Sequence, residues 1–221
     1  MKKPGGIFSN FLHIITRALA TLLLRVFYGI KVTGEENIPE KEGVMFMSNH
    51  SSFFDPPLVS TMSWKRQLNF MARDTLFKNP FFGGFIRAVG AIPIKRGAVD
   101  RKSWGALTDR ISEGGAVVFF PEGTRTPDGE IKDGKPGTGM LVHASRAKVV
   151  PVYIKGAFEA WPKGGGLPKL FKKMEVHYGK LMSFDDCLDK EGSREIYEKI
   201  TNAIVNEIRR MKAEKEKPDS K

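Results

Sequence analysis

Cysteine, histidine and long apolar runs are scarce in this chain, and each scarcity argues against a class of protein. The one cysteine, Cys187, excludes an intramolecular disulfide and gives no sign of an oxidising compartment. The four histidines are scattered along 221 residues and lack the spacing of zinc ligands. No run of about 18 uncharged apolar residues occurs, so the sequence does not support a conventional membrane-spanning helix.

Two further absences limit the chemistry and the architecture. The sequence contains no Gly-x-Ser-x-Gly motif, the turn that presents the nucleophile of an α/β-hydrolase. It also has no internal repeats and no extended low-complexity segment. A length of 221 residues is sufficient for one α/β domain with a sizeable core.

Acidic residues are also fewer than basic residues. The chain has 36 Lys and Arg residues against 25 Asp and Glu residues, a formal net charge of +11. Such an excess indicates an anionic partner, which can be a lipid head group, a nucleic acid or an acidic carrier protein. Because no RNA-binding or DNA-binding motif is present, we expect no nucleic-acid partner.

The N-terminal region contains a helical pattern of apolar side chains. Residues 7–30 place Ile, Leu, Phe and Val at helical spacing, opposite a polar stripe that includes Arg17 and Arg25. This pattern predicts an amphipathic helix that lies in the membrane interface, and we assign residues 1–32 to it. The two arginines interrupt the apolar region, which disfavours a signal peptide. Packing of the helix on a protein core is the alternative.

The most informative chemical pattern is Asn-His-Ser-Ser-Phe-Phe-Asp at residues 49–55, directly after an apolar run. A neutral imidazole at His50 can take a proton, and a carboxylate at Asp55 can hold its other ring nitrogen. Residues five apart diverge on a straight helix, so we predict a strand at 44–48, then a turn, then a helix capped by Asp55. His50 then lies at a strand's carboxyl end, where α/β sheets bind ligands. A loop histidine beside a purely capping Asp55 explains the same residues, and both interpretations remain open.

Polar residues also follow a second apolar run, at 116–120, in the sequence Pro-Glu-Gly-Thr-Arg-Thr. Glu122 can accept a hydrogen bond from a hydroxyl, and Gly123 allows a ligand to approach the backbone. Arg125 offers a planar fork that matches phosphate oxygens. A pair of Glu122 and Arg125 in solvent is the alternative interpretation.

A third apolar segment begins at Gly90 and ends in two adjacent cations, a pattern that alone is typical of a solvated strand edge. Four segments of the chain resemble, in order and spacing, the four sequence blocks of the glycerolipid acyltransferases. They are residues 49–55, 90–96 and 120–125, and Val-Val-Pro-Val at 149–152. The resemblance covers about residues 44–156 and is strongest to the bacterial 1-acylglycerol-3-phosphate acyltransferases.

The resemblance implies transfer of a fatty acyl group from a thioester to the sn-2 hydroxyl of lysophosphatidic acid, which gives phosphatidic acid in phospholipid synthesis. The thioester is an acyl carrier protein or coenzyme A derivative, and neither a metal nor a cofactor is implied. His50 is then the general base, and Asp55 orients it. The implied substrate-binding residues are Arg96 and Arg125 on the phosphate with Lys95 in support, Glu122 on a glycerol hydroxyl, Gly123 and Thr124 in the turn, and Arg73 beside the phosphate.

Two alternative functions remain. A nonenzymatic peripheral membrane-binding module explains the charge and the N-terminal helix, although it leaves the blocks at 49–55 and 120–125 unexplained. An acyltransferase for another lysolipid or for glycerol 3-phosphate is the second alternative. We expect the protein at the cytoplasmic face of the cell membrane, with monotopic or peripheral attachment through the N-terminal segment.

The remaining pattern predicts the architecture. Helical patterns at 99–113 and 137–146 alternate with short apolar strands, which indicates one α/β domain at 33–213 with a largely parallel sheet flanked by helices. Residues 214–221 form a charged flexible tail.

Two other segments each have two open interpretations. Residues 64–86, the most apolar part of the domain, either line an acyl-chain groove or fill the core. Residues 163–169 are rich in Gly and Pro and predict a loop. With Trp161 before it and Phe171, Lys172 and Lys173 after it, this loop is either solvated or in contact with anionic lipid.

Overall fold

The computed structural model describes residues 7–63, 66–88, 90–94 and 101–217. Its seven strands form one sheet in the order β1-β7-β6-β2-β5-β3-β4. The strands are β1 (Lys31–Thr33), β2 (Val44–Ser48), β3 (Leu68–Arg73), β4 (Ala91–Ile94), β5 (Ala116–Phe119), β6 (Lys148–Lys155) and β7 (Glu175–Tyr178). The α-helices are α1 (Ile7–Tyr28), α2 (Asp55–Met62), α3 (Pro80–Ala88), α4 (Arg101–Ser112), α5 (Pro136–Ser145), α6 (Ala157–Ala160), α7 (Asp185–Leu188) and α8 (Arg194–Lys215), and two 3-10 turns are η1 (Glu35–Asn37) and η2 (Asp74–Phe77).

The sheet is largely parallel, as the sequence predicts. Strands β2 to β6 all run in one direction, whereas β7 is antiparallel to β6 and pairs in parallel with β1. The carboxyl ends of β2 to β6 therefore meet at one edge, which we call the carboxyl edge, and β7 and β1 begin there. This is the edge at which parallel α/β sheets assemble ligand sites.

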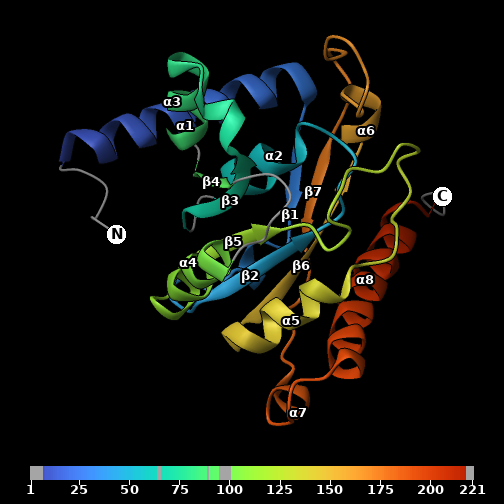
Figure 1. Ribbon diagram of the computed structural model, residues 1–221. Helices are drawn as coiled ribbons and strands as arrows, with labels where there is room; N and C mark the ends of the chain where they lie inside the picture. The colour runs from blue at the N-terminus through green and yellow to red at the C-terminus, as the bar shows by residue number, and fades with distance from the viewer. Residues whose placement is uncertain (1–6, 64–65, 89, 95–100, 218–221) are drawn as a thin grey trace.

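Helices cover both faces of the sheet (Figure 1). Because side chains alternate along a strand, Val44 and Phe46 of β2 face the core that includes α2, while Met45 and Met47 face the core that includes α4, α5 and α8. All five residues of β2 are buried, as expected for the continuous apolar run of a central parallel strand. The chain after β2 therefore leaves from the middle of the sheet.

Helix α1 contacts α2 and α3 and buries part of its polar side together with Ala20, while Arg25 stays exposed. Thr21 and Tyr28 are buried, and the Thr21 hydroxyl donates to the carbonyl of Thr61 in α2. Most large apolar residues of α1 are exposed instead, so the helix does not fill the core with its apolar side. Within the described parts of the chain, every helix is too short or too polar to cross a membrane.

The apolar segment at 64–86 forms β3, η2 and α3, which the sequence did not resolve into elements. Phe70 and Ile86 are buried, in line with core packing. Phe81, Phe82 and Phe85 of α3 are exposed, so this helix is only partly a core element. At the other end of the chain, α8 continues to Lys215, and the predicted tail therefore begins as helix.

Candidate active site

His50 and Asp55 lie on either side of the turn that joins β2 to α2. Asp55 is the first residue of α2, and Phe54, with φ −78° and ψ −20°, takes the N-cap position without a side-chain cap. The prediction that Asp55 caps the helix is therefore off by one residue. Its side chain turns back over the preceding turn, which brings it to the imidazole.

One oxygen of Asp55 organises this turn. Its Oδ2 lies 2.9 Å from Nδ1 of His50 and accepts the backbone N–H groups of Ser51 at 2.6 Å and Ser52 at 2.7 Å. The carboxylate is fully buried, whereas the His50 side chain is 17% exposed. Because a carboxylate accepts, Nδ1 carries the ring proton and Nε2 is the basic nitrogen. The arrangement suits a general base that meets a ligand from the solvent side.

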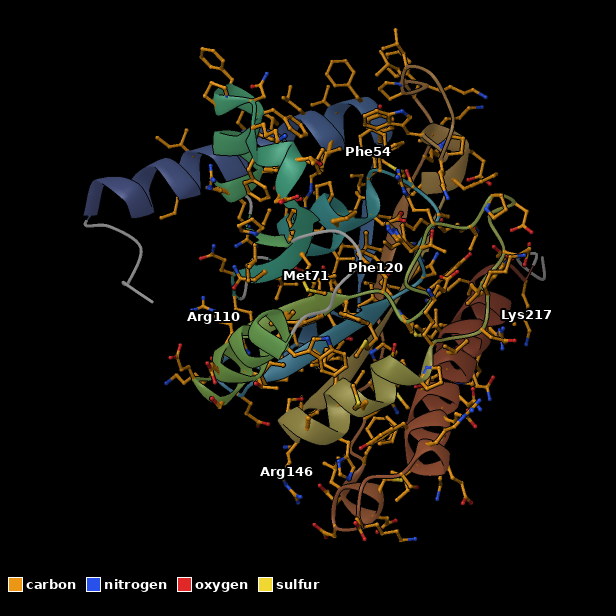
Figure 2. All side chains as sticks on the ribbon, in the orientation of Figure 1. Phe54, Met71, Arg110, Phe120, Arg146 and Lys217 are labelled. Atoms are coloured by element: carbon orange, nitrogen blue, oxygen red, sulfur yellow. The ribbon has the colours of Figure 1, made fainter. Side chains whose placement is uncertain are left out.

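The loop after β5 contacts His50 at the face of its ring and at its backbone carbonyl. The ring of Phe120 stacks on the imidazole, with ring centroids 4.0 Å apart and planes 19° from parallel. The carbonyl of His50 accepts the backbone N–H of Thr126 at 2.9 Å. Figure 2 labels Phe120 in the middle of the molecule, below Phe54 of the β2–α2 turn. The two loops thus form one unit at the carboxyl edge.

Glu122 joins these two loops. Its Oε1 accepts the backbone N–H of His50 at 2.8 Å, and its Oε2 accepts the backbone N–H of Lys132 at 3.2 Å. The residue is 3% exposed, and this burial raises the pKa of the Glu122 carboxyl to about 7. The two N–H donors oppose that rise, since they favour the charged form. The expected contact between Glu122 and a substrate hydroxyl stays a prediction.

Arg125 belongs to the same unit and is half-buried. Its guanidinium sits over the ring of Phe53, 3.6 Å from the ring centroid. Gly123 adopts a φ of +69°, which a residue with a side chain rarely takes, and Thr124 is exposed beside it. The turn at 123–125 therefore presents an arginine at the carboxyl edge, within the same loop unit as His50.

The structure does not test the phosphate contacts predicted for three residues. Lys95 and Arg96 lie outside the described residues, as does the side chain of Arg73. The backbone of Arg73 ends β3 and pairs with Ile94 at the end of β4. Both strands end at the carboxyl edge, on the side of β5 that is away from β2.

Some residues of the site were not predicted from the sequence. Phe53 and Phe120 were assigned no role beyond their position in a block, yet they support Arg125 and His50. Trp161 was also missed: its carbonyl accepts the Ser52 hydroxyl at 2.8 Å, and its ring lies 4.8 Å from that of Phe53. The sequence carries no signal for the Trp161 contact, because more than 100 residues separate it from the turn.

A cavity of about 450 Å³ lies behind the turn, lined by Asn49 and Ser51 together with charged residues of both signs. Lys155, Lys212 and Glu216 belong to this lining, so the cavity does not have the apolar walls that an acyl chain needs. Among the residues that the structure describes, no three His, Cys, Asp or Glu side chains gather in a way that could hold a metal ion.

Several known proteins resemble this chain in sequence. The chloroplastic 1-acyl-sn-glycerol-3-phosphate acyltransferase LPAT1 of Arabidopsis thaliana is 31% identical over 160 residues, which cover 70% of this chain and 44% of that protein. The 1-acyl-sn-glycerol-3-phosphate acyltransferase of Bacillus subtilis is 30% identical over 152 residues, which cover 69% of this chain and 72% of that protein. The chain spans less than half the length of its plant and algal relatives.

A solved structure and a family model extend the comparison. The crystal structure of the 1-acyl-sn-glycerophosphate acyltransferase PlsC from Thermotoga maritima matches with a TM-score of 0.68 and 25% identity, over 93% of this chain and 80% of that one. The family model described as Acyltransferase matches residues 29–155, more than half of the chain and the part that holds His50, Asp55, Glu122 and Arg125. The chain therefore belongs to the acyltransferase family.

Proposed function

We propose that this protein transfers a fatty acyl group from an acyl thioester to the sn-2 hydroxyl of 1-acylglycerol 3-phosphate, with phosphatidic acid as the product. The observation that carries the proposal is the His50–Asp55 pair, joined at 2.9 Å, at the carboxyl edge of a parallel sheet. The names of the relatives, 1-acyl-sn-glycerol-3-phosphate acyltransferase in both plant and bacterial proteins, support this choice of acceptor.

In the proposed reaction, Nε2 of His50 takes the proton of the acceptor hydroxyl while the hydroxyl oxygen attacks the thioester carbon. The tetrahedral intermediate then expels the thiolate, which receives the proton from the imidazolium. Asp55 accepts the Nδ1–H and stabilises the imidazolium between these two steps. A base of this kind contributes about 10² to 10⁴ in rate.

Arg125 is the residue that we assign to the acceptor phosphate. Its guanidinium is held over Phe53 in the turn next to His50, and a bidentate contact with phosphate oxygens suits its planar fork. Arg96 is also proposed to bind the phosphate, with Lys95 in support and Arg73 beside it. Ile94, the last described residue before Lys95 and Arg96, and the backbone of Arg73 end strands that run to the same carboxyl edge.

For Glu122 the geometry favours a positioning role. Both of its carboxylate oxygens already accept backbone N–H groups, one of them from His50 itself. We infer that Glu122 holds the base in place, and that a contact with a glycerol hydroxyl is secondary. Gly123 and Thr124 shape the turn that presents Arg125.

The proposed location is the cytoplasmic face of the cell membrane, with α1 lying in the interface. An isolated apolar face in water is unfavourable, whereas the interface accepts it. The net charge of +11 favours the anionic lipid of this face. The exposed apolar residues of α1 are Ile14, Ile15, Leu19, Leu22, Leu23, Val26 and Phe27.

A turnover assay tests the proposed function. Purified protein is offered a defined acyl thioester, on acyl carrier protein or on coenzyme A, with lysophosphatidic acid, glycerol 3-phosphate or a neutral lysolipid as acceptor. We expect transfer to lysophosphatidic acid, and loss of at least about 10²-fold in the variant His50→Ala. Transfer to another acceptor with none to lysophosphatidic acid would overturn the assigned acceptor, and undiminished turnover by His50→Ala would overturn the assigned base.

A further inference from the structure

The loop between α6 and β7, residues 161–174, displays apolar side chains to the outside. Leu167 is 90% exposed and Phe171 is 74% exposed, with Leu170 exposed between them. Single exposed apolar residues are common on soluble proteins, but three within five positions of one loop form a patch.

The same loop is basic throughout. It carries four lysines, Lys163, Lys169, Lys172 and Lys173, all exposed, and no acidic residue between positions 161 and 174. Lysines that flank exposed Leu and Phe side chains are the composition that binds anionic phospholipid, since the cations meet phosphate groups while the apolar side chains enter the acyl boundary. The charge therefore selects an anionic lipid surface as the partner.

The loop is held by hydrogen bonds and ring contacts. The indole N–H of Trp161 donates to the carbonyl of Gly166 at 2.9 Å, and the backbone N–H of Lys169 donates to the carbonyl of Ala160 at 2.8 Å. Phe171 donates its backbone N–H to the carbonyl of Phe27 at 2.9 Å, and the two rings lie 6.2 Å apart. These contacts join the loop to the C-terminal end of α1, so both belong to one surface at the upper end of Figure 1.

Trp161 also connects this surface to the active-site turn. Its carbonyl accepts the backbone N–H of Phe53 at 3.3 Å and the hydroxyl of Ser52 at 2.8 Å. Its ring lies 4.8 Å from the ring of Phe53, which in turn carries Arg125. A loop seated on the lipid would thus bring the head-group layer to the residue that we assign to the acceptor phosphate.

We propose that the α6–β7 loop is a second membrane-docking element that binds an anionic phospholipid surface beside α1 and sets the carboxyl edge against the head groups. Lys163 and Lys169 bind the lipid phosphates, and Leu167, Leu170 and Phe171 insert below them. The docking itself stands on the exposure and charge of the loop, while its effect on turnover rests on the proposed function.

Vesicle co-sedimentation of the full chain tests the docking. The probes are vesicles of phosphatidylglycerol with phosphatidylcholine and vesicles of phosphatidylcholine alone. We expect Leu167→Asp, and separately the pair Lys163→Glu and Lys169→Glu, to weaken binding to the anionic vesicles, the lysine pair by at least about tenfold, because each cation near the surface contributes about fivefold. The matched control is Leu181→Asp, at a residue that is 38% exposed after β7, at the opposite edge of the sheet.

A second measurement separates docking from chemistry. With a water-soluble, monomeric short-chain 1-acylglycerol 3-phosphate, Leu167→Asp should turn over like the unchanged protein, while its KM for vesicle-borne lysophosphatidic acid should rise. Vesicle binding by Leu167→Asp equal to that of Leu181→Asp would overturn the docking proposal. Absence of turnover by the unchanged protein on both acceptors would overturn the proposed function and leave the vesicle result intact.

Discussion

The substitution Asp55→Asn separates two functions of the carboxylate at position 55. In the structure, a single oxygen, Oδ2, accepts from Nδ1 of His50 and from the backbone N–H groups of Ser51 and Ser52. An asparagine must place its carbonyl oxygen at the same point, since its NH₂ group would face three donors there. The turn and the ring tautomer are therefore retained, and what is lost is the negative charge.

The size of the effect follows from Coulomb's law. At about 4 Å and an effective dielectric constant of about 20, a carboxylate stabilises an imidazolium by about 4 kcal/mol. Because about 1.4 kcal/mol corresponds to a factor of ten in rate, we expect kcat to fall by about 10³-fold. The new NH₂ group takes the place of Oδ1, a buried atom without a described hydrogen-bond partner, and its burial costs about 1–3 kcal/mol of folding stability.

The assay is steady-state turnover with lysophosphatidic acid, together with thermal unfolding of the same preparations. The KM should change little, because Asp55 acts through His50 and is fully buried from the substrate. The matched control is Asp128→Asn, at an exposed carboxylate outside the turn. A folded Asp55→Asn protein whose kcat stays within threefold of the unchanged enzyme would refute the charge argument, and so would a large rise in KM with an unchanged kcat.

Three other predictions follow from the same geometry. Arg125→Ala should raise the KM for lysophosphatidic acid by about 10- to 100-fold, as loss of a charge-assisted contact implies, and steady-state kinetics with an unchanged KM would contradict the phosphate role. The pKa of Glu122 is raised from its ordinary 4.5 to about 7 in the folded state, so the unfolded chain releases this proton at a lower pH than the folded protein does. As the pH rises from 4.5 to 7, the free energy of unfolding of the unchanged protein should therefore fall by about 3 kcal/mol relative to that of Glu122→Gln. Denaturant unfolding measures both proteins across this range, and the same pH dependence in both would argue against the raised pKa. Leu22→Asp on the exposed face of α1 should weaken binding to anionic vesicles in a flotation assay without lowering the melting temperature, and undiminished binding would exclude that face from the interface.

The choice of Leu22→Asp over removal of the whole N-terminal segment has a structural reason. Tyr28 is buried in the core, and its carbonyl accepts the backbone N–H of Met174 before β7. Removal of residues 1–30 would expose this core, so a loss of vesicle binding would be mixed with a loss of folding. A single exposed substitution avoids that ambiguity.

Local patterns predicted the elements that carry strong periodicity. The apolar run at 44–48 is β2, and the helical pattern at 137–146 is α5 within one residue at each end. The pairing of His50 with Asp55 was also foreseen as one of two interpretations, since a strand, a turn and a helix start can bring residues five positions apart together. The elements β3 and α3 were missed, because an apolar segment with both buried and exposed faces has no single period.

The sequence by itself determined the alternation of helices and strands, the positive charge, and the two polar segments that follow β2 and β5. These are properties of neighbouring residues, so they can be read along the chain. Only the tertiary structure decided that Glu122 holds the backbone of His50, that Phe120 covers the imidazole, and that Trp161 joins the basic loop to the turn. These contacts link positions about 70 and 110 residues apart, and they depend on which strands lie side by side in the sheet, a choice made by packing of the whole chain.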